Sequence, residues 1–281
     1  MAQRRFENKS VFITGASSGI GAALGVAFAR EGARVALAAR NADRLGEVQR
    51  LIEGEGGRAL SLTCDVTDRG SVDYAVAQTV AAFGGIDVAV ANAGFSVAGV
   101  MTGLTTEDYR RQFDTNFFGV LDTIYAALPH LQASKGRLGV VSSVMGRLGA
   151  PGVSPYCASK FALCGLLESI DYELADLGVS VTCINPGLVA SNIRRTDNSG
   201  RVHVERKDPV PAWIIVPTDK AARDIVTAIY KRKFEAIITG HGKVAYWITR
   251  HFPGLSRAIL RRVLRGRAEQ MAKVRTDAGQ T

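Results

Sequence analysis

The chain has 281 residues, 47% of them hydrophobic and 22% charged, a composition typical of one or at most two globular domains. Its apolar runs are too short to span a bilayer, and its first fifteen residues are too polar for a signal peptide. The four cysteines have neither CxxC nor metal-ligand spacing, so we expect free thiols, no metal site and a cytoplasmic location.

The net charge of +9 is concentrated near the C-terminal end. Residues 243–275 hold nine lysines and arginines and one acid, whereas the rest of the chain is nearly neutral. Binding to a phosphate backbone needs a basic stripe on the body of the protein, so the sequence does not indicate a nucleic-acid partner. We expect a catalytic domain over residues 1–242 and a basic, helical extension over residues 243–281.

Short β-branched segments alternate with helical patterns along the chain. Strands are expected at residues 10–15, 34–40, 58–66, 86–94, 136–143 and 179–187. Helices are expected at residues 19–32, 41–55, 69–84 and 106–133, and from about residue 155. Because the strands are apolar throughout, both faces of the sheet should be covered. The predicted fold class is α/β, a Rossmann-like doubly wound parallel sheet with helices on both faces, which binds ligands beyond the carboxyl ends of its strands.

The segment TGASSGIG, residues 14–21, joins the first expected strand to the first expected helix. A glycine suits the tight turn there, and the later glycines allow close approach of the backbone to a phosphate. The start of the helix adds free N–H groups and a partial positive charge. We therefore predict that a dinucleotide phosphate binds at Gly15, Ser17, Ser18, Gly19, Ile20 and Gly21.

The GxxxGxG spacing of this loop resembles that of the short-chain dehydrogenase/reductase family, and the resemblance spans about residues 8–240. Later motifs follow in order, CDV at 64–66, ANAG at 91–94, DTNFFG at 114–119 and NPGLVAS at 185–191. The resemblance implies cofactor contacts from Asp65, Val66, Asn92, Ala93, Gly94, Pro186, Gly187, Val189 and Ser191. Ala91 stands where the family has asparagine, which could loosen the sheet there, and Ser191 stands where threonine is usual. The resemblance also implies a homodimer or homotetramer.

The segment SPYCASK, residues 154–160, sets Tyr156 and Lys160 four residues apart, so they share a face of a helix. A nearby ammonium lowers the pKa of a phenol, although many such pairs are merely solvated. The resemblance implies that Tyr156 exchanges a proton with the substrate oxygen, and that Lys160 lowers its pKa and contacts the cofactor. It further implies that Ser143, in preference to Ser142, holds the substrate oxygen. Asn116 is implied to hold a water that relays protons from Lys160.

The end of the second expected strand bears on the choice of cofactor. Dinucleotide sites that select NAD carry an acid there, whereas an arginine accommodates the 2′-phosphate of NADP. This strand ends with Ala39 and Arg40, followed by Asn41. We predict NADP binding through Arg40 and Asn41. The alternative is that Arg40 only pairs with a surface carboxylate such as Asp43.

Residues 191–217 are expected to form the substrate loop, polar at first and then apolar around Trp213 and Ile214. Apolar residues near the tyrosine, namely Met145, Leu148, Pro151 and Val153, could form a pocket wall or simply core. We expect a small hydrophobic carbonyl or secondary alcohol substrate, of steroid, retinoid or acyl type. The alternative is a catalytically silent dinucleotide-binding sensor or scaffold. Such proteins usually lose the tyrosine or the lysine, and this chain keeps both.

An amphipathic basic helix is expected after Pro253. Its apolar positions are Leu255, Ile259, Leu260, Val263 and Leu264, and its basic positions are Arg257, Arg261, Arg262 and Arg265. Three roles are open. The helix could pack with a solvated basic face, dock on this protein or a second subunit, or lie on an anionic membrane surface. We favour peripheral membrane contact.

Overall fold

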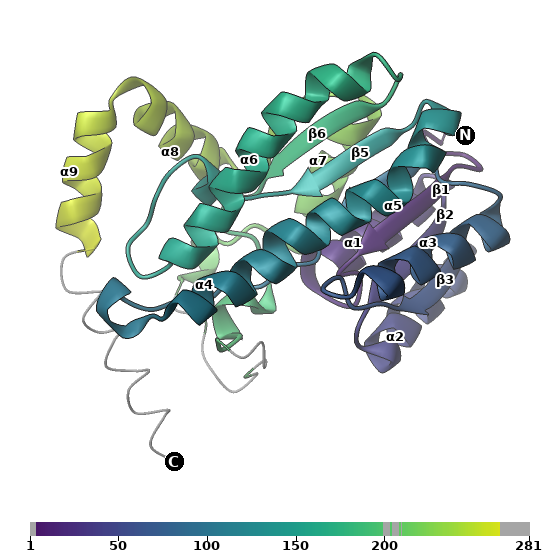
Figure 1. Ribbon diagram of the computed structural model, residues 1–281, viewed down its shortest axis with the longest axis horizontal. Coiled ribbons are helices and arrows are strands. Elements are labelled where there is room, and N and C mark those ends of the chain that lie inside the picture. The colour runs from purple at the N-terminus through teal and green to yellow at the C-terminus, as the bar shows by residue number, and fades with distance from the viewer. Residues whose placement is uncertain (1–3, 199–202, 204–207, 209, 265–281) are drawn as a thin grey trace.

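The computed structural model describes residues 4–198, 203, 208 and 210–264, and this part contains a seven-stranded parallel sheet (Figure 1). The strand order is β3-β2-β1-β4-β5-β6-β7. The strands are β1 (Ser10–Thr14), β2 (Arg34–Ala39), β3 (Arg58–Thr63), β4 (Val88–Ala91), β5 (Arg137–Val141), β6 (Ser180–Asn185) and β7 (Glu235–Ile237). The order reverses between β1 and β4, and ligands of doubly wound sheets bind at such a switch point.

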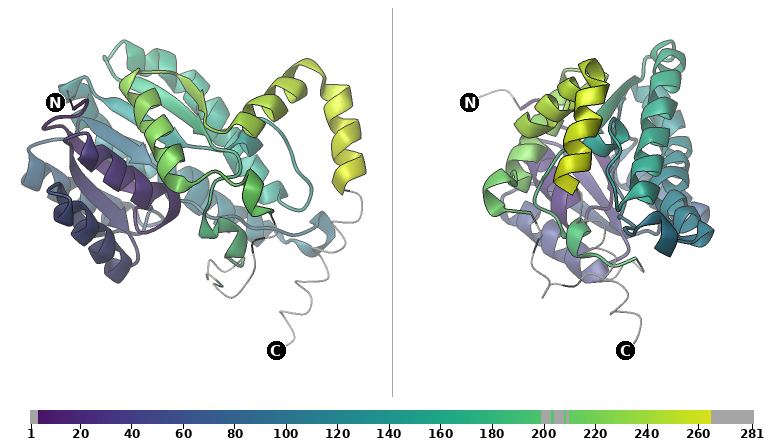
Figure 2. Two further views of the ribbon diagram at one scale, coloured as in Figure 1. Left: turned by 180° about the vertical axis from the view of Figure 1, so that it is seen from behind. Right: turned by 90° about the vertical axis from the view of Figure 1, so that its left-hand side faces the viewer.

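Helices cover both faces of the sheet (Figures 1 and 2). One face carries α1 (Gly19–Arg30), α2 (Ala42–Gly54) and α7 (Thr218–Tyr230). The other carries α3 (Arg69–Phe83), α5 (Gly119–Ser134) and α6 (Ser154–Ala175). Each layer forms its own hydrophobic core against the sheet, because the strands are buried on both sides. The predicted fold class is confirmed, and β7 and α7 extend it beyond the elements that we expected.

The helix expected over residues 106–133 is one continuous run that contains a π-helical turn. It consists of α4 (Thr106–Phe113), the π-helical turn η2 (Asp114–Phe118) and α5. A capping box between Thr105 and Asp108 opens it. A π-helical turn inserts an extra residue into a helix and is frequent at functional sites. Here it carries Asn116, which is fully buried.

The replacement of asparagine by Ala91 does not loosen the sheet. Ala91 is buried and pairs in register with Val140 of β5. The small side chain fits because both faces of β4 are covered by helices, so a methyl group there is packed instead of leaving a gap.

Two helices follow the sheet at the C-terminal side, α8 (Gly240–His251) and α9 (Pro253–Leu264). Both lie off the carboxyl edge of the sheet in the two opposite views, and α9 stands away from the body (Figures 1 and 2). The helix expected after Pro253 corresponds to α9, and its expected continuation through Arg265 lies outside the described residues. The expected boundary after residue 242 falls inside α8, where Gly242 is buried. Among the described residues, no helix combines the length and apolarity that crossing a bilayer requires.

Candidate active site

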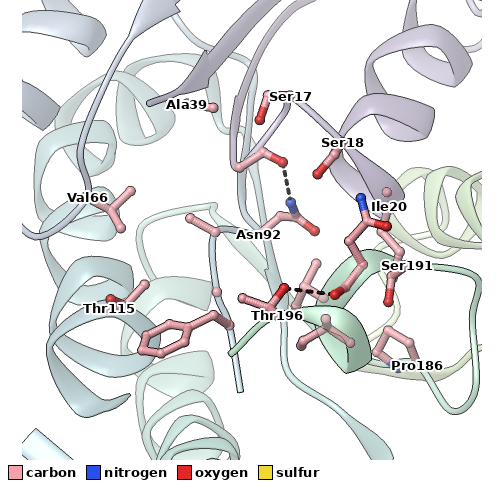
Figure 3. Close-up of a pocket in the computed structure, with 18 of the residues that line it drawn as sticks. Ser17, Ser18, Ile20, Ala39, Val66, Asn92, Thr115, Pro186, Ser191 and Thr196 are labelled. Carbon is pink, nitrogen blue, oxygen red and sulfur yellow. Dashed lines mark hydrogen bonds between the residues drawn. The ribbon is translucent and has the colours of Figure 1, made fainter. Parts of the chain in front are cut away.

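The turn after β1 is held by close packing against the segment that follows β4. Gly15 has a φ of +66°, and a Cβ atom there would lie 2.7 Å from the Ala93 Cα. The Thr14 hydroxyl accepts hydrogen bonds from the backbone N–H groups of Asn92 (3.0 Å) and Ala93 (3.2 Å). The Asn92 amide in turn donates to the carbonyls of Thr14 (2.9 Å) and Gly15 (3.2 Å), next to the turn that carries Ser17 (Figure 3). These contacts hold the turn after β1 and the segment after β4 together as one rigid surface, called here the pocket floor.

A pocket of about 560 Å³ opens above this floor, at the carboxyl ends of the strands. Figure 3 shows Ala39 and Val66 on one side of it and Pro186 and Ser191 on the other. The predicted site residues that line it are Gly15, Ser17, Ser18, Gly19, Ile20, Arg40, Asn41, Asp65, Val66, Asn92, Ala93, Gly94, Ser143, Tyr156, Lys160, Pro186, Gly187, Val189 and Ser191. Two predicted site residues, Gly21 and Asn116, lie behind the wall.

Gly21 lies directly behind the glycine-rich turn. A Cβ atom on Gly21 would come within 2.2 Å of the Gly15 carbonyl oxygen and 2.5 Å of the Asn92 amide nitrogen. Any side chain would push α1 away from the turn. Gly21 therefore shapes the turn without facing the pocket.

The pocket end beside β2 carries two arginines. Arg40 is exposed, and its guanidinium has no ion-pair partner among the described residues, Asp43 included. Asn41 caps α2 by accepting a hydrogen bond from the Arg44 backbone N–H (2.9 Å). This cap places Arg44 in the first turn of α2, on the pocket wall.

Asp65 lies on the same side of the pocket, just beyond β3. Its carboxylate accepts hydrogen bonds from the backbone N–H (3.0 Å) and the hydroxyl (2.8 Å) of Thr67. Its own backbone N–H donates to the Ser71 hydroxyl (3.1 Å). The side chain is thus fixed at the pocket wall by local contacts.

Ser143, Tyr156 and Lys160 meet at the other end of the pocket. Ser143 follows β5, is largely buried and accepts a hydrogen bond from the Met145 N–H (3.1 Å). Its hydroxyl is close enough to the Tyr156 hydroxyl to lower the pKa of the phenol. The neighbouring Ser142 hydroxyl instead donates to the Lys160 carbonyl (3.2 Å) inside the core. Of the two serines, Ser143 therefore has the hydroxyl beside the tyrosine.

The Lys160 ammonium is buried, with 4% of the residue exposed, and donates to the Val141 carbonyl (2.8 Å). Its Nζ lies 5.7 Å from the centre of the Tyr156 ring. Burial lowers the pKa of Lys160 to about 8, because the charged form loses solvation. Burial likewise raises the pKa of Tyr156 to about 12, and the Ser143 hydroxyl offsets only part of this rise. Desolvation is the largest cause of the rise, so the prediction that Lys160 lowers the phenol pKa stays a prediction.

Asn116 lies behind Gly94 and not in the pocket. Its carbonyl oxygen accepts from the Phe95 N–H (3.1 Å), and its amide donates to the Phe95 carbonyl (3.0 Å) and more weakly to Ser159 (3.4 Å). A Cβ atom on Gly94 would lie 3.1 Å from the Asn116 oxygen and 3.8 Å from the Lys160 Nζ. The Asn116 amide, from η2, and the Lys160 ammonium, from α6, therefore both lie close to Gly94.

The loop of residues 186–189 closes the pocket beside Tyr156 and is supported from α8. The Leu188 N–H donates to the His241 Nε2 (2.9 Å). Gly187 packs so closely on α8 that a Cβ atom would lie 2.2 Å from the Thr239 hydroxyl oxygen. Burial lowers the pKa of His241, which keeps the ring neutral and Nε2 free to accept.

The chain was compared with known proteins. The family model for short chain dehydrogenases matches residues 9–201. The chain belongs to the short-chain dehydrogenase/reductase family. It is therefore an oxidoreductase of that family, whose members use a nicotinamide dinucleotide.

Three similar proteins illustrate the membership. An uncharacterized oxidoreductase of Bacillus subtilis, YxnA, is 31% identical over 93% of this chain and 74% of its own length. A glycine betaine reductase of Emericella nidulans, ATRR, is 34% identical over 79% of this chain. The match covers only 17% of the length of that protein. The solved alcohol dehydrogenase of Thermococcus sibiricus, complexed with 5-hydroxy-NADP, is 26% identical with a TM-score of 0.71, covering 82% of this chain and 96% of that one.

The pocket residues fit a dinucleotide of the kind that short-chain dehydrogenases use. The glycine turn leaves no room for a Cβ atom at Gly15 or Gly21 and keeps its backbone close to the pocket, beside the start of α1. The guanidinium groups of Arg40 and Arg44 lie at one end of the pocket and the Lys160 ammonium at the other, and none of the three forms an ion pair with a described residue. Among the described residues, no group of histidine, cysteine and acidic side chains is arranged to hold a metal ion.

Several pocket residues were not named by the sequence analysis, namely Arg44, Cys64, Phe95, Thr115 and Val141. Four more pocket residues belong to the expected substrate loop, namely Asn192, Ile193, Arg194 and Thr196. Arg44 could have been inferred, since a helix capped by Asn41 places its third residue beside the cap. Met145, Leu148, Pro151 and Val153, which could have formed a pocket wall or simply core, do not line this pocket. Of the expected substrate loop, residues 199–202, 204–207 and 209 lie outside the described residues. The histidines stay outside the pocket lining, yet His241 supports a pocket loop, which we did not predict.

Proposed function

We propose that this chain is an NADP(H)-dependent oxidoreductase that interconverts a carbonyl and a secondary alcohol on a small hydrophobic substrate. The observation that carries the proposal is the meeting of Ser143, Tyr156 and Lys160 at one end of a pocket whose other end carries Arg40 and Arg44. A pocket with these two ends suits an extended ligand that has a reactive end and a phosphate-bearing end.

The preference for NADP rests on charge. Ala39 ends β2 where an acid would select NAD, and Arg40 has no carboxylate partner among the described residues. Arg44 adds a second guanidinium on the same wall. Two guanidinium groups can bind a phosphate with several charge-assisted hydrogen bonds, whereas a ribose hydroxyl gains much less from them. The NADP analogue bound to the similar alcohol dehydrogenase supports this choice.

The proton chemistry is assigned to Tyr156. When bound, the nicotinamide ring supplies or accepts the hydride. The pKa of Tyr156, about 12, keeps its phenol protonated at neutral pH, so it is ready to donate to a carbonyl oxygen. Ser143, whose hydroxyl lies beside the phenol, is placed to hold the same oxygen.

Lys160 and Asn116 are assigned to proton supply. With a pKa of about 8, the Lys160 ammonium is charged at neutral pH and holds a mobile proton near the phenol. Asn116 and Lys160 approach Gly94 together, which supports a relay from Lys160 through a water held by Asn116. We assign Asn116 to positioning because its amide is already bonded to the Phe95 backbone.

The substrate class is inferred from the pocket wall near Tyr156. Phe95 and Ile193 supply apolar surface there, which favours a steroid-, retinoid- or acyl-like compound. Arg194 lies on the same wall, but its guanidinium is bonded to Asp208 (2.6 Å) and to the Val189 carbonyl. Because its guanidinium has these partners, Arg194 stabilises the pocket wall and is not free to bind an anionic substrate.

The alternative is a silent dinucleotide-binding sensor. Against it, the four residues implied in catalysis are all present, and three of them lie together in the pocket. Burying the Lys160 ammonium costs desolvation free energy, and a protein that catalyses no reaction gains no function that offsets this cost.

We also propose a homodimer or homotetramer in the cytoplasm. Exposed aromatic side chains on α5 and α6 support self-association, among them Tyr125 and Phe161. The buried, unpaired thiols of the four cysteines support a reducing compartment. Light scattering after size-exclusion chromatography measures the subunit number.

The test is turnover of a panel of hydrophobic ketones with NADPH by full-length protein and two variants. Tyr156→Phe removes the proton donor and should lower kcat at least about a hundredfold, with NADPH binding retained. Tyr172→Phe is the matched control, because Tyr172 is 79% exposed on the same helix. Near-normal turnover of Tyr156→Phe refutes the catalytic assignment. If no compound on the panel is turned over while NADPH binds, the sensor alternative is favoured.

A further inference from the structure

The hairpin of α8 and α9, residues 240–264, presents large apolar side chains to solvent. Five of them, named here the hairpin patch, are Val244 (59% exposed), Trp247 (55%), Phe252 (49%), Leu255 (54%) and Ile259 (44%). The Trp247 and Phe252 rings lie 5.5 Å apart, so the patch is joined across the turn between the helices. Soluble proteins rarely leave such clusters uncovered unless they bind something.

The body of the protein does not cover this surface. Among the described helices and strands, α9 packs mainly on α8, where Ser256 is buried and its hydroxyl lies 3.0 Å from that of Thr249. The opposite views in Figures 1 and 2 show α9 standing away from the sheet. On α9, Leu255 and Ile259 are four residues apart and share an exposed face.

The hairpin also carries exposed cations, and it has no acid of its own. Residues 240–264 contain no aspartate or glutamate. The exposed cations are Lys243, Arg250, Arg257, Arg261 and Arg262. None of the five forms an ion pair with a described residue. An apolar face beside unpaired lysines and arginines is the pattern of a helix that lies in the headgroup region of a membrane.

We propose that the hairpin patch docks on an anionic membrane surface. Tryptophan and phenylalanine favour the interface between headgroups and acyl chains, and each nearby lysine or arginine gains from anionic lipid. A second copy of the chain fits less well. A two-fold contact places each patch against its own equivalent, which would bring the five cations of each copy together without acids.

The position of the hairpin gives docking a consequence for the proposed function. The hairpin lies off the carboxyl edge of the sheet, the edge at which the pocket opens (Figure 1). A docked protein would therefore hold its pocket close to the bilayer, where apolar carbonyl compounds concentrate. This consequence rests on the proposed function, whereas docking itself needs neither substrate nor cofactor.

The first experiment is co-sedimentation of the full-length protein with vesicles of phosphatidylcholine alone or with added phosphatidylserine. The triple variant R257E/R261E/R262E reverses three cations of α9. The control triple variant K220E/K231E/K233E reverses three exposed lysines of the body. We expect binding to anionic vesicles that R257E/R261E/R262E weakens at least about tenfold and the control variant changes little. Thermal denaturation of each variant checks that it is folded.

A second experiment tests whether the apolar side chains of the hairpin patch enter the membrane or whether charge alone drives binding. The chain has two tryptophans, so Trp213→Phe leaves Trp247 as the sole tryptophan reporter. We expect its emission to shift to the blue with anionic vesicles and to be quenched by brominated lipid. The absence of vesicle binding at low salt, equal loss of binding in both triple variants, or an unshifted Trp247 emission overturns the proposal. So does a fall in subunit number on Ile259→Ser, which would make the patch a subunit interface.

Discussion

His241 offers a test of how the pocket is held from outside its wall. It lies in the first turn of α8, and its Nε2 accepts the Leu188 N–H at 2.9 Å. Leu188 belongs to the loop whose neighbours Gly187 and Val189 line the pocket. We predict that His241→Ala weakens dinucleotide binding although His241 itself lies outside the pocket lining.

The magnitude follows from the geometry of this contact. A neutral hydrogen bond contributes about 0.5–1.5 kcal/mol, and a donor left unsatisfied in the interior costs about 1–3 kcal/mol. Leu188 is only partly buried, so water can replace part of the lost bond. A loss of about 1 kcal/mol corresponds to a roughly fivefold rise in the Kd for NADPH. The same loss should lower Tm by about 2–4 °C in a chain of this size.

The contact also has a predictable pH dependence. Burial lowers the pKa of His241 from its usual value of 6.5. As the pH falls below about 6.5, the unfolded chain takes up a proton that the folded chain does not, so the free energy of unfolding decreases. The contribution of His241 is fully present above that pH and is lost as the pH falls through the folded pKa. His241→Gln keeps an acceptor for Leu188 but does not titrate.

The assay is calorimetric titration of NADPH together with thermal denaturation, each near pH 8 and near pH 5.5. His241→Gln should bind NADPH more tightly than His241→Ala and should lose less stability on acidification than the unmodified protein. His251→Ala is the matched control, since His251 ends the same helix and is exposed. Unchanged NADPH affinity in His241→Ala, with unchanged pH dependence of Tm, would refute the reasoning.

Two further predictions concern charges in the pocket. The double variant Ala39→Asp/Arg40→Leu should weaken or reverse a preference for NADPH over NADH in binding titrations. Arg50→Leu is the control, because Arg50 is exposed. Equal affinities of the unmodified protein for NADPH and NADH would contradict the role of Arg40. Lys160→Met should raise the free energy of unfolding near neutral pH by about 1–3 kcal/mol in urea denaturation while impairing turnover, because it removes a buried charge. The difference in free energy of unfolding between Lys160→Met and the unmodified protein should shrink as the pH rises from about 8 to 10.5. In this range the unfolded chain holds a proton that folded Lys160 has released, so the unmodified protein gains stability. A difference that does not change with pH would contradict the argument.

The sheet could be predicted from the sequence because its strands are uniformly apolar and its helices are periodic. Ile13, Val35 and Val90 belong to such strands, and all three are fully buried. β7 escaped prediction because it has three residues, one of them the charged Glu235. A strand so short at a sheet edge owes its conformation to pairing with β6, which local sequence does not encode.

Most pocket-lining motif residues were found because their motifs follow the ends of strands, whereas Tyr156 and Lys160 were found from their spacing on a helix. Contacts across the fold were not found in this way. His241 and Leu188 are separated by 53 residues, and the π-helical turn around Asn116 interrupts a helix whose sequence reads as continuous. The rise in the Tyr156 pKa was not foreseen for a related reason. Sequence shows the lysine four residues away but not the desolvation of the phenol, which is the largest cause of the rise.

The pocket is held together by polar contacts that run between elements far apart in the chain. Thr14 fixes the segment after β4, Lys160 of α6 binds the Val141 carbonyl at the end of β5, and His241 of α8 binds the loop after β6. Each contact joins a side chain to a main-chain group at a strand end, so each fixes backbone that lines the pocket. The last of these ties the pocket to the hairpin that we propose for membrane docking. One hydrogen bond therefore connects α8 directly to the loop after β6.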